Sequence, residues 1–227
     1  MLKYHIPVTK YGLPQVLIYP AFVLVLMAVL FIFIPNVILL VMAEIVLFLI
    51  LLWMLMFFRD PRRKIPLNEK ILLSPADGTV TDISETEISE LGGKALCIGI
   101  FLSIFNVHIN RMPCSANVEL VRYKKGKFKN AMSKEAGKIN EANEILLTRL
   151  TEPQDRLLLR QLSGAIARHI VCKAKPGKEY TQGEPFGMIK FGSRTELYIP
   201  LKEGHNIAVK IGDKVNAGLS PLVIYKL

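Results

Sequence analysis

The stretch KPGKEYTQG at residues 175–183 returns 35 residues later as KIGDKVNAG at residues 210–218. Both copies carry glycine at the third and ninth positions, an aromatic or apolar residue at the sixth, and charged residues between them. Glycine adopts positive φ at little cost, so this pattern predicts two strand–turn–strand units. Two copies are too few for a solenoid.

Short apolar stretches separated by Gly, Pro, Asn and Asp make up most of the chain from Leu72 onward. Such stretches are typical of strands joined by turns, and they include residues 78–83, 95–102, 165–172 and 196–199. Only residues 129–149, with few β-branched side chains, are compatible with a helix. We therefore predict a mainly β (α+β) domain. Its repeated unit resembles the barrel-sandwich arrangement of lipoyl and biotinyl carrier domains.

Two apolar runs precede this domain. The first spans residues 16–34, and the second spans residues 37–58 and contains a single charged residue, Glu44. Each run is long enough as a helix to cross a bilayer, and Pro35-Asn36 between them is typical of a turn. The sequence therefore predicts an N-terminal transmembrane helical hairpin over residues 1–58, followed by one domain over residues 59–227.

Basic residues flank both ends of the predicted hairpin. Lys3 and Lys10 precede it, and four basic residues follow it, namely Arg59, Arg62, Arg63 and Lys64. The positive-inside rule then places both ends, and the domain, on the cytoplasmic side of the cell membrane. Residues 59–227 hold 27 basic and 18 acidic residues. That excess beside an anchor favours an anionic bilayer surface over nucleic acid, since no basic motif is interleaved with aromatic residues.

The three cysteines, Cys97, Cys114 and Cys172, have no C-x-x-C spacing. An odd and sparse set argues against a disulfide framework and against a structural zinc site. We therefore expect no metal and a reducing compartment.

Several residues able to do chemistry lie in short motifs along the domain. His108 lies at the end of an apolar stretch that turns polar, Asp77 lies in a turn after a proline, and Ser193 follows a glycine. Together these motifs resemble phosphatidylserine decarboxylases, in particular the short, membrane-anchored bacterial and archaeal branch that includes archaetidylserine decarboxylases. The resemblance covers about residues 57–227 and rests on Phe57-Phe-Arg-Asp-Pro, Ser74-Pro-Ala-Asp-Gly, Phe105-Asn-Val-His-Ile-Asn-Arg, Asn140-Glu, Gly164-Ala-Ile-Ala-Arg and Phe191-Gly-Ser-Arg. Two positions depart from the family pattern, because His169 and Ala142 each stand where arginine is usual.

The resemblance implies a self-processing zymogen that decarboxylates phosphatidylserine to phosphatidylethanolamine and CO2. Ser193 would attack the carbonyl of Gly192, and the chain would break there into a large chain (1–192) and a small chain (193–227) that stay together as a heterodimer. Ser193 would become a covalent pyruvoyl group, the cofactor that forms a Schiff base with the substrate amine. His108 is then the expected base, and Asp77 is expected to hold its imidazole.

Arg111 and Arg194 are the candidates for holding the phosphate or carboxylate of the substrate, an anionic phospholipid. Archaetidylserine has the same headgroup as phosphatidylserine, so it stays open as an alternative substrate, and a higher oligomer also stays open. Three rival interpretations remain: a non-enzymatic membrane-anchored lipoyl-like adaptor, a carrier module modified on Lys190, and a pyruvoyl enzyme for a soluble amino acid. The adaptor needs one span and an external domain, whereas this sequence contains two apolar runs.

Overall fold

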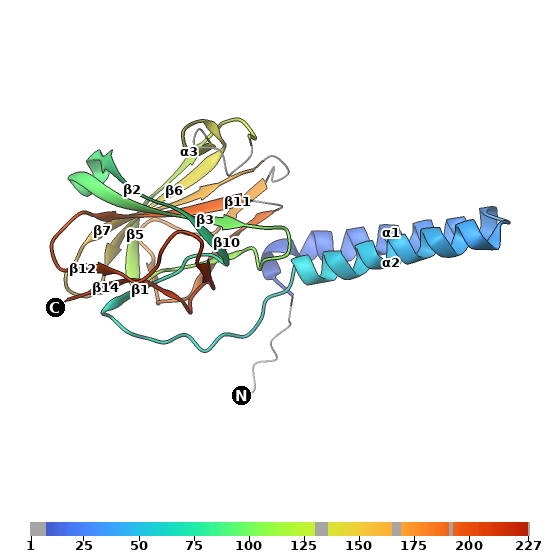
Figure 1. Cartoon of the computed structure of the whole chain (residues 1–227), viewed down its shortest axis with the longest axis horizontal. Coiled ribbons are helices and arrows are strands. Elements are labelled where there is room, and N and C mark those ends of the chain that lie inside the picture. Colours follow the sequence, from blue (N-terminus) through green and yellow to red (C-terminus); the bar gives the residue numbers. More distant parts are fainter. Residues whose placement is uncertain (1–7, 130–135, 165–168, 191–192, 227) are drawn as a thin grey trace. The chain divides into compact units, whose positions relative to one another are not determined.

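A computed structural model describes residues 8–129, 136–164, 169–190 and 193–226 of the chain. The chain divides into two compact units, residues 1–62 and residues 63–227. The first unit is helical and the second is rich in strands (Figure 1).

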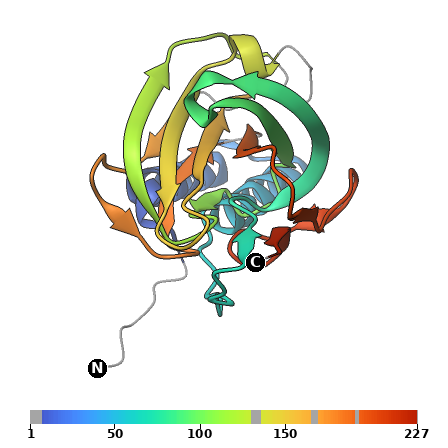
Figure 2. The same cartoon turned by 90° about the vertical axis from the view of Figure 1, so that its left-hand side faces the viewer.

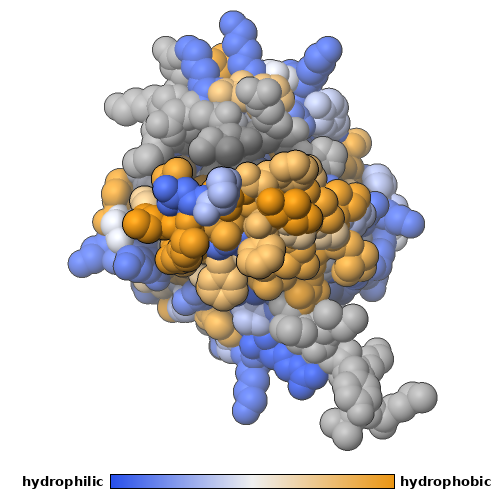
Figure 3. Space-filling view, turned by 90° about the vertical axis from the view of Figure 1, so that its right-hand side faces the viewer, coloured by the Kyte–Doolittle hydropathy of each residue, from blue (hydrophilic) through white to orange (hydrophobic). Residues whose placement is uncertain are grey.

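The helical unit consists of a short 3-10 turn, η1 (Lys10–Gly12), and two long helices, α1 (Leu13–Phe33) and α2 (Val37–Phe57). The side chain of Asn36 begins α2 by accepting hydrogen bonds from the backbone amides of Ile38 and Leu39, at 3.0 and 3.1 Å. Both helices are long and apolar enough to cross a membrane, and many of their large apolar side chains are exposed. The end-on view in Figure 3 shows a patch of apolar side chains with a few polar ones among them. The two predicted apolar runs are thus confirmed as helices.

The second unit contains fourteen described strands and two short helical turns. The elements are β1 (Ile71–Leu73), β2 (Gly78–Ile88), η2 (Ser89–Leu91), β3 (Gly93–Leu102), β4 (Ile109–Arg111), β5 (Ala116–Lys124), α3 (Ala136–Ile139), β6 (Ala142–Arg149), β7 (Arg156–Leu162), β8 (His169–Cys172), β9 (Glu179–Tyr180), β10 (Pro185–Lys190), β11 (Ser193–Pro200), β12 (His205–Ile207), β13 (Lys214–Val215) and β14 (Pro221–Tyr225).

The strands form three sheets. Two sheets have three strands each, in the orders β1-β14-β12 and β4-β10-β8, and the third has eight strands in the order β13-β2-β3-β11-β7-β6-β5-β9.

The eight-stranded sheet curls into a half-barrel (Figure 2). Its strands pair antiparallel, and β11 lies inside the sheet between β3 and β7. All eight residues of β11 are buried. The strand is buried because both of its faces are covered. Leu197 and Ile199 join the main hydrophobic core on one face, while Tyr198 joins a smaller cluster on the other.

The sequence repeat is a structural repeat. Its four glycines, Gly177, Gly183, Gly212 and Gly218, all have positive φ, between 71° and 98°. Equivalent amides make equivalent hydrogen bonds: Gly177 N donates to Val118 O at 2.7 Å and Gly212 N to Val80 O at 2.8 Å, while Gly183 N donates to Met112 O and Gly218 N to Ser74 O, both at 2.8 Å. The predicted requirement for glycine at these positions is confirmed.

The predicted fold class is confirmed as mainly β with two N-terminal apolar helices. The expectation of a helix over residues 129–149 is wrong for its second half, since residues 142–149 form β6 inside the large sheet. Strand β6 is buried on both faces at nearly every position. Such strands lack the alternation that identifies a half-exposed strand. Residues 130–135 of that expectation lie outside the described part of the chain.

Candidate active site

Ser193 is the first residue of β11, and its side chain is fully buried. Alternation places it on the same face of β11 as Leu197 and Ile199, toward the main core. Among the described residues its Oγ has no hydrogen-bond partner. Buried hydroxyls are normally paired, so an unpaired one marks a site worth explaining. Gly192, the other residue of the predicted cleavage site, lies outside the described residues.

His108 directly precedes β4 and is also fully buried. Its Nδ1 lies 2.9 Å from the carbonyl oxygen of Asn106. A carbonyl only accepts, so in the neutral ring Nδ1 carries the proton and Nε2 is the basic nitrogen. The backbone amide of Ile189, near the end of β10, donates to the carbonyl of His108 at 3.2 Å. This bond places His108 beside the end of the strand that leads to Ser193.

A buried polar link joins the segments that carry His108 and Ser193. Asn110 donates through Nδ2 to Thr195 Oγ1 at 3.0 Å and accepts through Oδ1 from Gln161 Nε2 at 2.8 Å. Asn110 follows His108 by two residues, and Thr195 follows Ser193 by two. Ser193 and Thr195 lie on the same face of β11, so this link lies on the Ser193 face of that strand. Asn110, Thr195 and Gln161 were not predicted from the sequence, although polar residues within apolar strands are a usable signal.

Asp77 is buried in the turn before β2 and is held by two partners. Its carboxylate forms a bidentate ion pair with Arg63, with both N–O distances 2.7 Å, and it accepts from the backbone amide of Ala217 at 2.7 Å. Neither of these two partners is His108. The imidazole contact expected of Asp77 therefore stays a prediction.

The two predicted substrate-binding arginines are both largely buried. Arg111 donates to the backbone carbonyl of Gly183 at 3.1 Å. Arg194 lies on the face of β11 opposite Ser193, where it pairs with Asp82 at 3.0 Å and with Glu196 at 2.9 Å. The structure thus brings Ser193 and His108 toward one end of β10 and β11, and it places the Arg194 side chain on the other side of the sheet.

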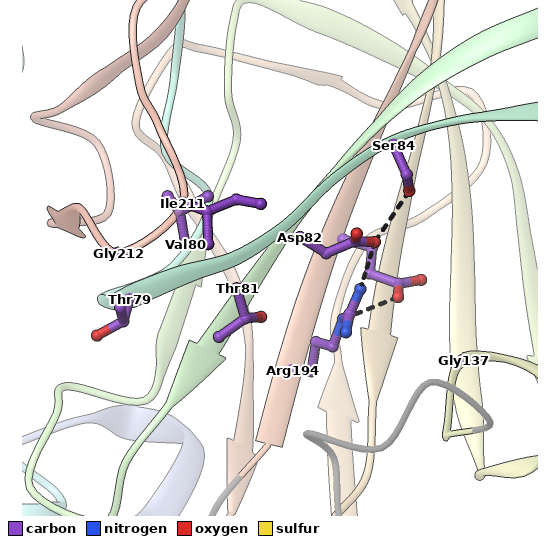
Figure 4. Close-up of a pocket in the computed structure, with 10 residues that line it drawn as sticks. Thr79, Val80, Thr81, Asp82, Ser84, Gly137, Arg194, Ile211 and Gly212 are labelled. Atoms are coloured by element: carbon purple, nitrogen blue, oxygen red, sulfur yellow. Dashed lines mark hydrogen bonds and ion pairs between the residues drawn. The ribbon is translucent and has the colours of Figure 1, made fainter.

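On the sheet face that carries the Arg194 side chain, charged residues occupy paired positions on neighbouring strands. The paired positions run from β2 to β5 through Asp82, Gly99, Glu196, Arg160, Glu144 and Arg122. The guanidinium of Arg194 lies over Gly99, which has no side chain. It donates a hydrogen bond to Asp82 (Figure 4). A cavity of about 670 Å³ borders Asp82, Arg194 and Glu196 at one end of this row, and β2 and β11 contribute most of its lining residues.

Burial also shifts several pKa values near these strands. It raises the pKa of the Cys97 and Cys114 thiols to about 12, and it lowers the pKa of the Lys190 amine. The three cysteines are free thiols. Within the described ranges, no cluster of three or more His, Cys, Asp or Glu side chains could hold a metal ion.

These features define the class of protein: a β-sheet enzyme with a buried serine and a buried histidine at the end of its central strands. A family model described as phosphatidylserine decarboxylase matches residues 50–222. The chain belongs to the phosphatidylserine decarboxylase family and is therefore a decarboxylase.

Curated relatives match most of the chain. Three bacterial proteins named phosphatidylserine decarboxylase proenzyme are similar to this chain. The one from Carboxydothermus hydrogenoformans is 47% identical over 174 residues, which are 76% of this chain and 80% of the relative. The one from Rhodopirellula baltica is 45% identical, covering 75% of this chain and 70% of the relative. The one from Solidesulfovibrio magneticus is 43% identical, covering 73% and 76%.

Proposed function

We propose that this chain is a self-processing decarboxylase that converts phosphatidylserine to phosphatidylethanolamine and CO2, using a pyruvoyl group made from Ser193. The observation that carries the proposal is Ser193 itself. It is fully buried at the start of a central strand, and its Oγ lacks a hydrogen-bond partner among the described residues. A hydroxyl left unpaired in this way is suited to react with its own backbone, and relatives of the chain are named proenzymes.

Apart from one water, self-processing needs only groups that the chain carries. Ser193 Oγ loses its proton and forms a bond to the carbonyl carbon of Gly192 as the peptide C–N bond breaks, which converts the amide to an ester and frees the amine of residue 193. Elimination then removes the Cα proton of residue 193 and breaks its Cβ–Oγ bond, leaving a carboxylate on Gly192 and a dehydroalanine at residue 193. One water hydrolyses the dehydroalanine and releases ammonia, so that residue 193 becomes pyruvoyl.

His108 is the base that we assign to this reaction. The Asn106 carbonyl holds the proton on Nδ1, so Nε2 is the nitrogen that takes the proton from Ser193 Oγ. When present, a pyruvoyl carbonyl supplies the sink for the electrons left behind when CO2 departs. His108 then returns a proton to the carbanion, since imidazole serves both as a general base and as a general acid. The family resemblance implies that Asp77 supports His108, and because both ring nitrogens have other partners in this assignment, that support is electrostatic.

The proposed small chain, residues 193–227, is interlocked with the rest of the domain. Its β11 pairs with both β3 and β7, its β13 pairs with β2, and its β14 pairs with β1. Releasing it would expose the main core and break these ladders. We therefore expect a heterodimer of the two chains from one precursor.

The helical hairpin fits a lipid substrate. A two-chain phospholipid stays in the bilayer, so its decarboxylase must work at the membrane surface. The basic residues that flank α1 and α2 favour a cytoplasmic domain. Arg111 and Arg194 stay predicted contacts of the lipid headgroup, and Arg194 would have to leave its two carboxylate partners to make that contact.

Intact mass spectrometry of the purified full-length protein tests the proposal. We expect two chains, residues 1–192 and 193–227, with no free amine at the start of the smaller one. Ser193→Ala should give one inactive 227-residue chain, and His108→Ala should accumulate the same uncut chain. Cyanoborohydride reduction with phosphatidylserine should attach the substrate amine to the small chain. A fully active, uncut chain with an ordinary serine at 193 would refute the proposal.

A further inference from the structure

The guanidinium of Arg63 makes three hydrogen bonds, two of them to the carboxylate of Asp77. Its guanidinium donates to both carboxylate oxygens of Asp77 at 2.7 Å, and Nη1 also donates to the backbone carbonyl of Ala217 at 2.5 Å. The side chains of Arg63 and Asp77 are only 6% and 7% exposed. A buried ion pair of this kind is costly to desolvate, so stability alone is a weak explanation for it.

The internal repeat shows what the fold itself requires at this position. Asp77 Oδ1 accepts a hydrogen bond from the backbone amide of Ala217 at 2.7 Å. In the other copy Ser115 Oγ accepts from the backbone amide of Gln182 at 3.2 Å. Residues 182 and 217 are equivalent in the repeat, being 35 residues apart. A serine hydroxyl therefore satisfies the turn, and the carboxylate with its arginine partner is an addition in the copy that contains Asp77.

The additions leave part of the carboxylate available. Among the residues that the structure describes, Oδ1 accepts two hydrogen bonds, from Arg63 and from Ala217 N, whereas Oδ2 accepts one, from Arg63. A carboxylate oxygen has two lone pairs. The bidentate contact thus fixes the plane of the carboxylate and leaves one acceptor site on Oδ2 in a defined direction.

We infer that Arg63 is a positioning residue for self-processing: it orients the Asp77 carboxylate and binds it to the Ala217 backbone of the future small chain. This inference rests on the proposed function, because it assumes that Asp77 supports the cleavage at Ser193. Arg63 is also the first residue of the strand-rich unit after the helical hairpin. The segment that follows the hairpin therefore contributes a side chain to the reaction.

The test compares cleavage half-times of full-length variants in detergent, read by intact mass. We expect Arg63→Gln to lengthen the half-time by at least about tenfold, the order expected when one charge-assisted contact is lost. Arg63→Lys should recover part of the rate, because it keeps the charge without the planar fork. Arg149→Gln is the matched control for damage to the fold. Arg149 is also buried, but it donates to the carbonyls of Pro153 and Glu69 instead.

A double substitution separates positioning from a merely structural role. Asp77→Ser copies the residue that the repeat itself uses at Ser115, so it keeps the turn and removes the carboxylate. We expect this variant to cleave slowly, so the reactions are followed for days. Asp77→Asn serves as a second variant that lacks the carboxylate. Adding Arg63→Gln to Asp77→Ser should slow cleavage no further, because Arg63 acts through Asp77.

The outcomes distinguish this inference from the proposed function. If Arg63→Gln cleaves at the wild-type rate, or if it slows cleavage as much in the Asp77→Ser background as in the wild type, the positioning role is wrong. The same holds if Arg149→Gln slows cleavage equally. In each of these cases an uncut Ser193→Ala chain leaves the proposed function standing. Cleavage of the Ser193→Ala chain would overturn the proposed function itself.

Discussion

Replacing Gly99 by alanine tests the charged row on the sheet face opposite Ser193. Gly99 lies in β3 between Asp82 and Glu196, and the guanidinium of Arg194 lies over it. An alanine Cβ at position 99 would lie 2.8 Å from Arg194 Cζ and 2.9 Å from Nε. These separations are well inside van der Waals contact, so the guanidinium must move away from its two carboxylates.

The cost of that movement follows from the burial of the partners. The side chain of Asp82 is 35% exposed, so losing its contact costs about 0.5–1 kcal/mol. Glu196 is 4% exposed, and weakening its contact costs about 1–3 kcal/mol. Alanine returns about 0.5–1 kcal/mol relative to glycine in a strand. We expect a net loss of about 1–3 kcal/mol in the free energy of unfolding, or about 2–10 °C in Tm.

The assay is thermal unfolding of the detergent-solubilised chain, followed by circular dichroism. All variants carry Ser193→Ala, so that the chain stays uncut and the measurement reports the fold alone. Arg194→Ala provides the matched control, because Gly99→Ala should not lower the free energy of unfolding once the guanidinium is absent. An unchanged Tm for Gly99→Ala, or an equal loss in the Arg194→Ala background, would refute the reasoning.

Three further predictions concern single side chains. Cys97 and Cys114, with pKa values raised by burial to about 12, should resist iodoacetamide at pH 8 in the folded protein and react once it is unfolded; rapid alkylation of the native state would contradict this. Burial lowers the pKa of His205, against the opposing pull of Asp155. The unfolded chain therefore takes up this proton first, and stability should fall as the pH drops below about 6.5. His205→Asn should flatten this loss between pH 7 and 5, and an unchanged slope would count against it. Gly78→Ala should destabilise the domain by about 3 kcal/mol, because its Cβ would lie 2.8 Å from a backbone carbonyl carbon of β3; normal denaturant unfolding of this variant would contradict the packing.

Local signals were enough to predict much of the fold. Apolar runs of bilayer length predicted α1 and α2, and the spaced glycines predicted the repeat, because these features depend on neighbours in sequence. Strand β6 was missed because burial on both faces removes the alternation that identifies a strand.

The candidate site was only partly accessible from sequence. Motifs drew attention to Ser193, His108 and Asp77, since each stands beside a turn or at the end of an apolar stretch. The ion pair between Arg63 and Asp77 depends on how the chain folds back between two loops, and no spacing rule connects them. The charged row on the other face depends on the register of six strands drawn from distant segments. Register of that kind is set by tertiary packing.

The position of β11 inside the large sheet has a consequence for the lifetime of the enzyme. The precursor folds as a single chain, so β11 finds its neighbours at the high effective concentration that a covalent tether provides. After the proposed cleavage a 35-residue piece would have to return by bimolecular encounter. Mature protein that unfolds in dilute solution should therefore not reassemble. Its working life is then governed by the rate of unfolding, and lost activity is replaced only by new synthesis.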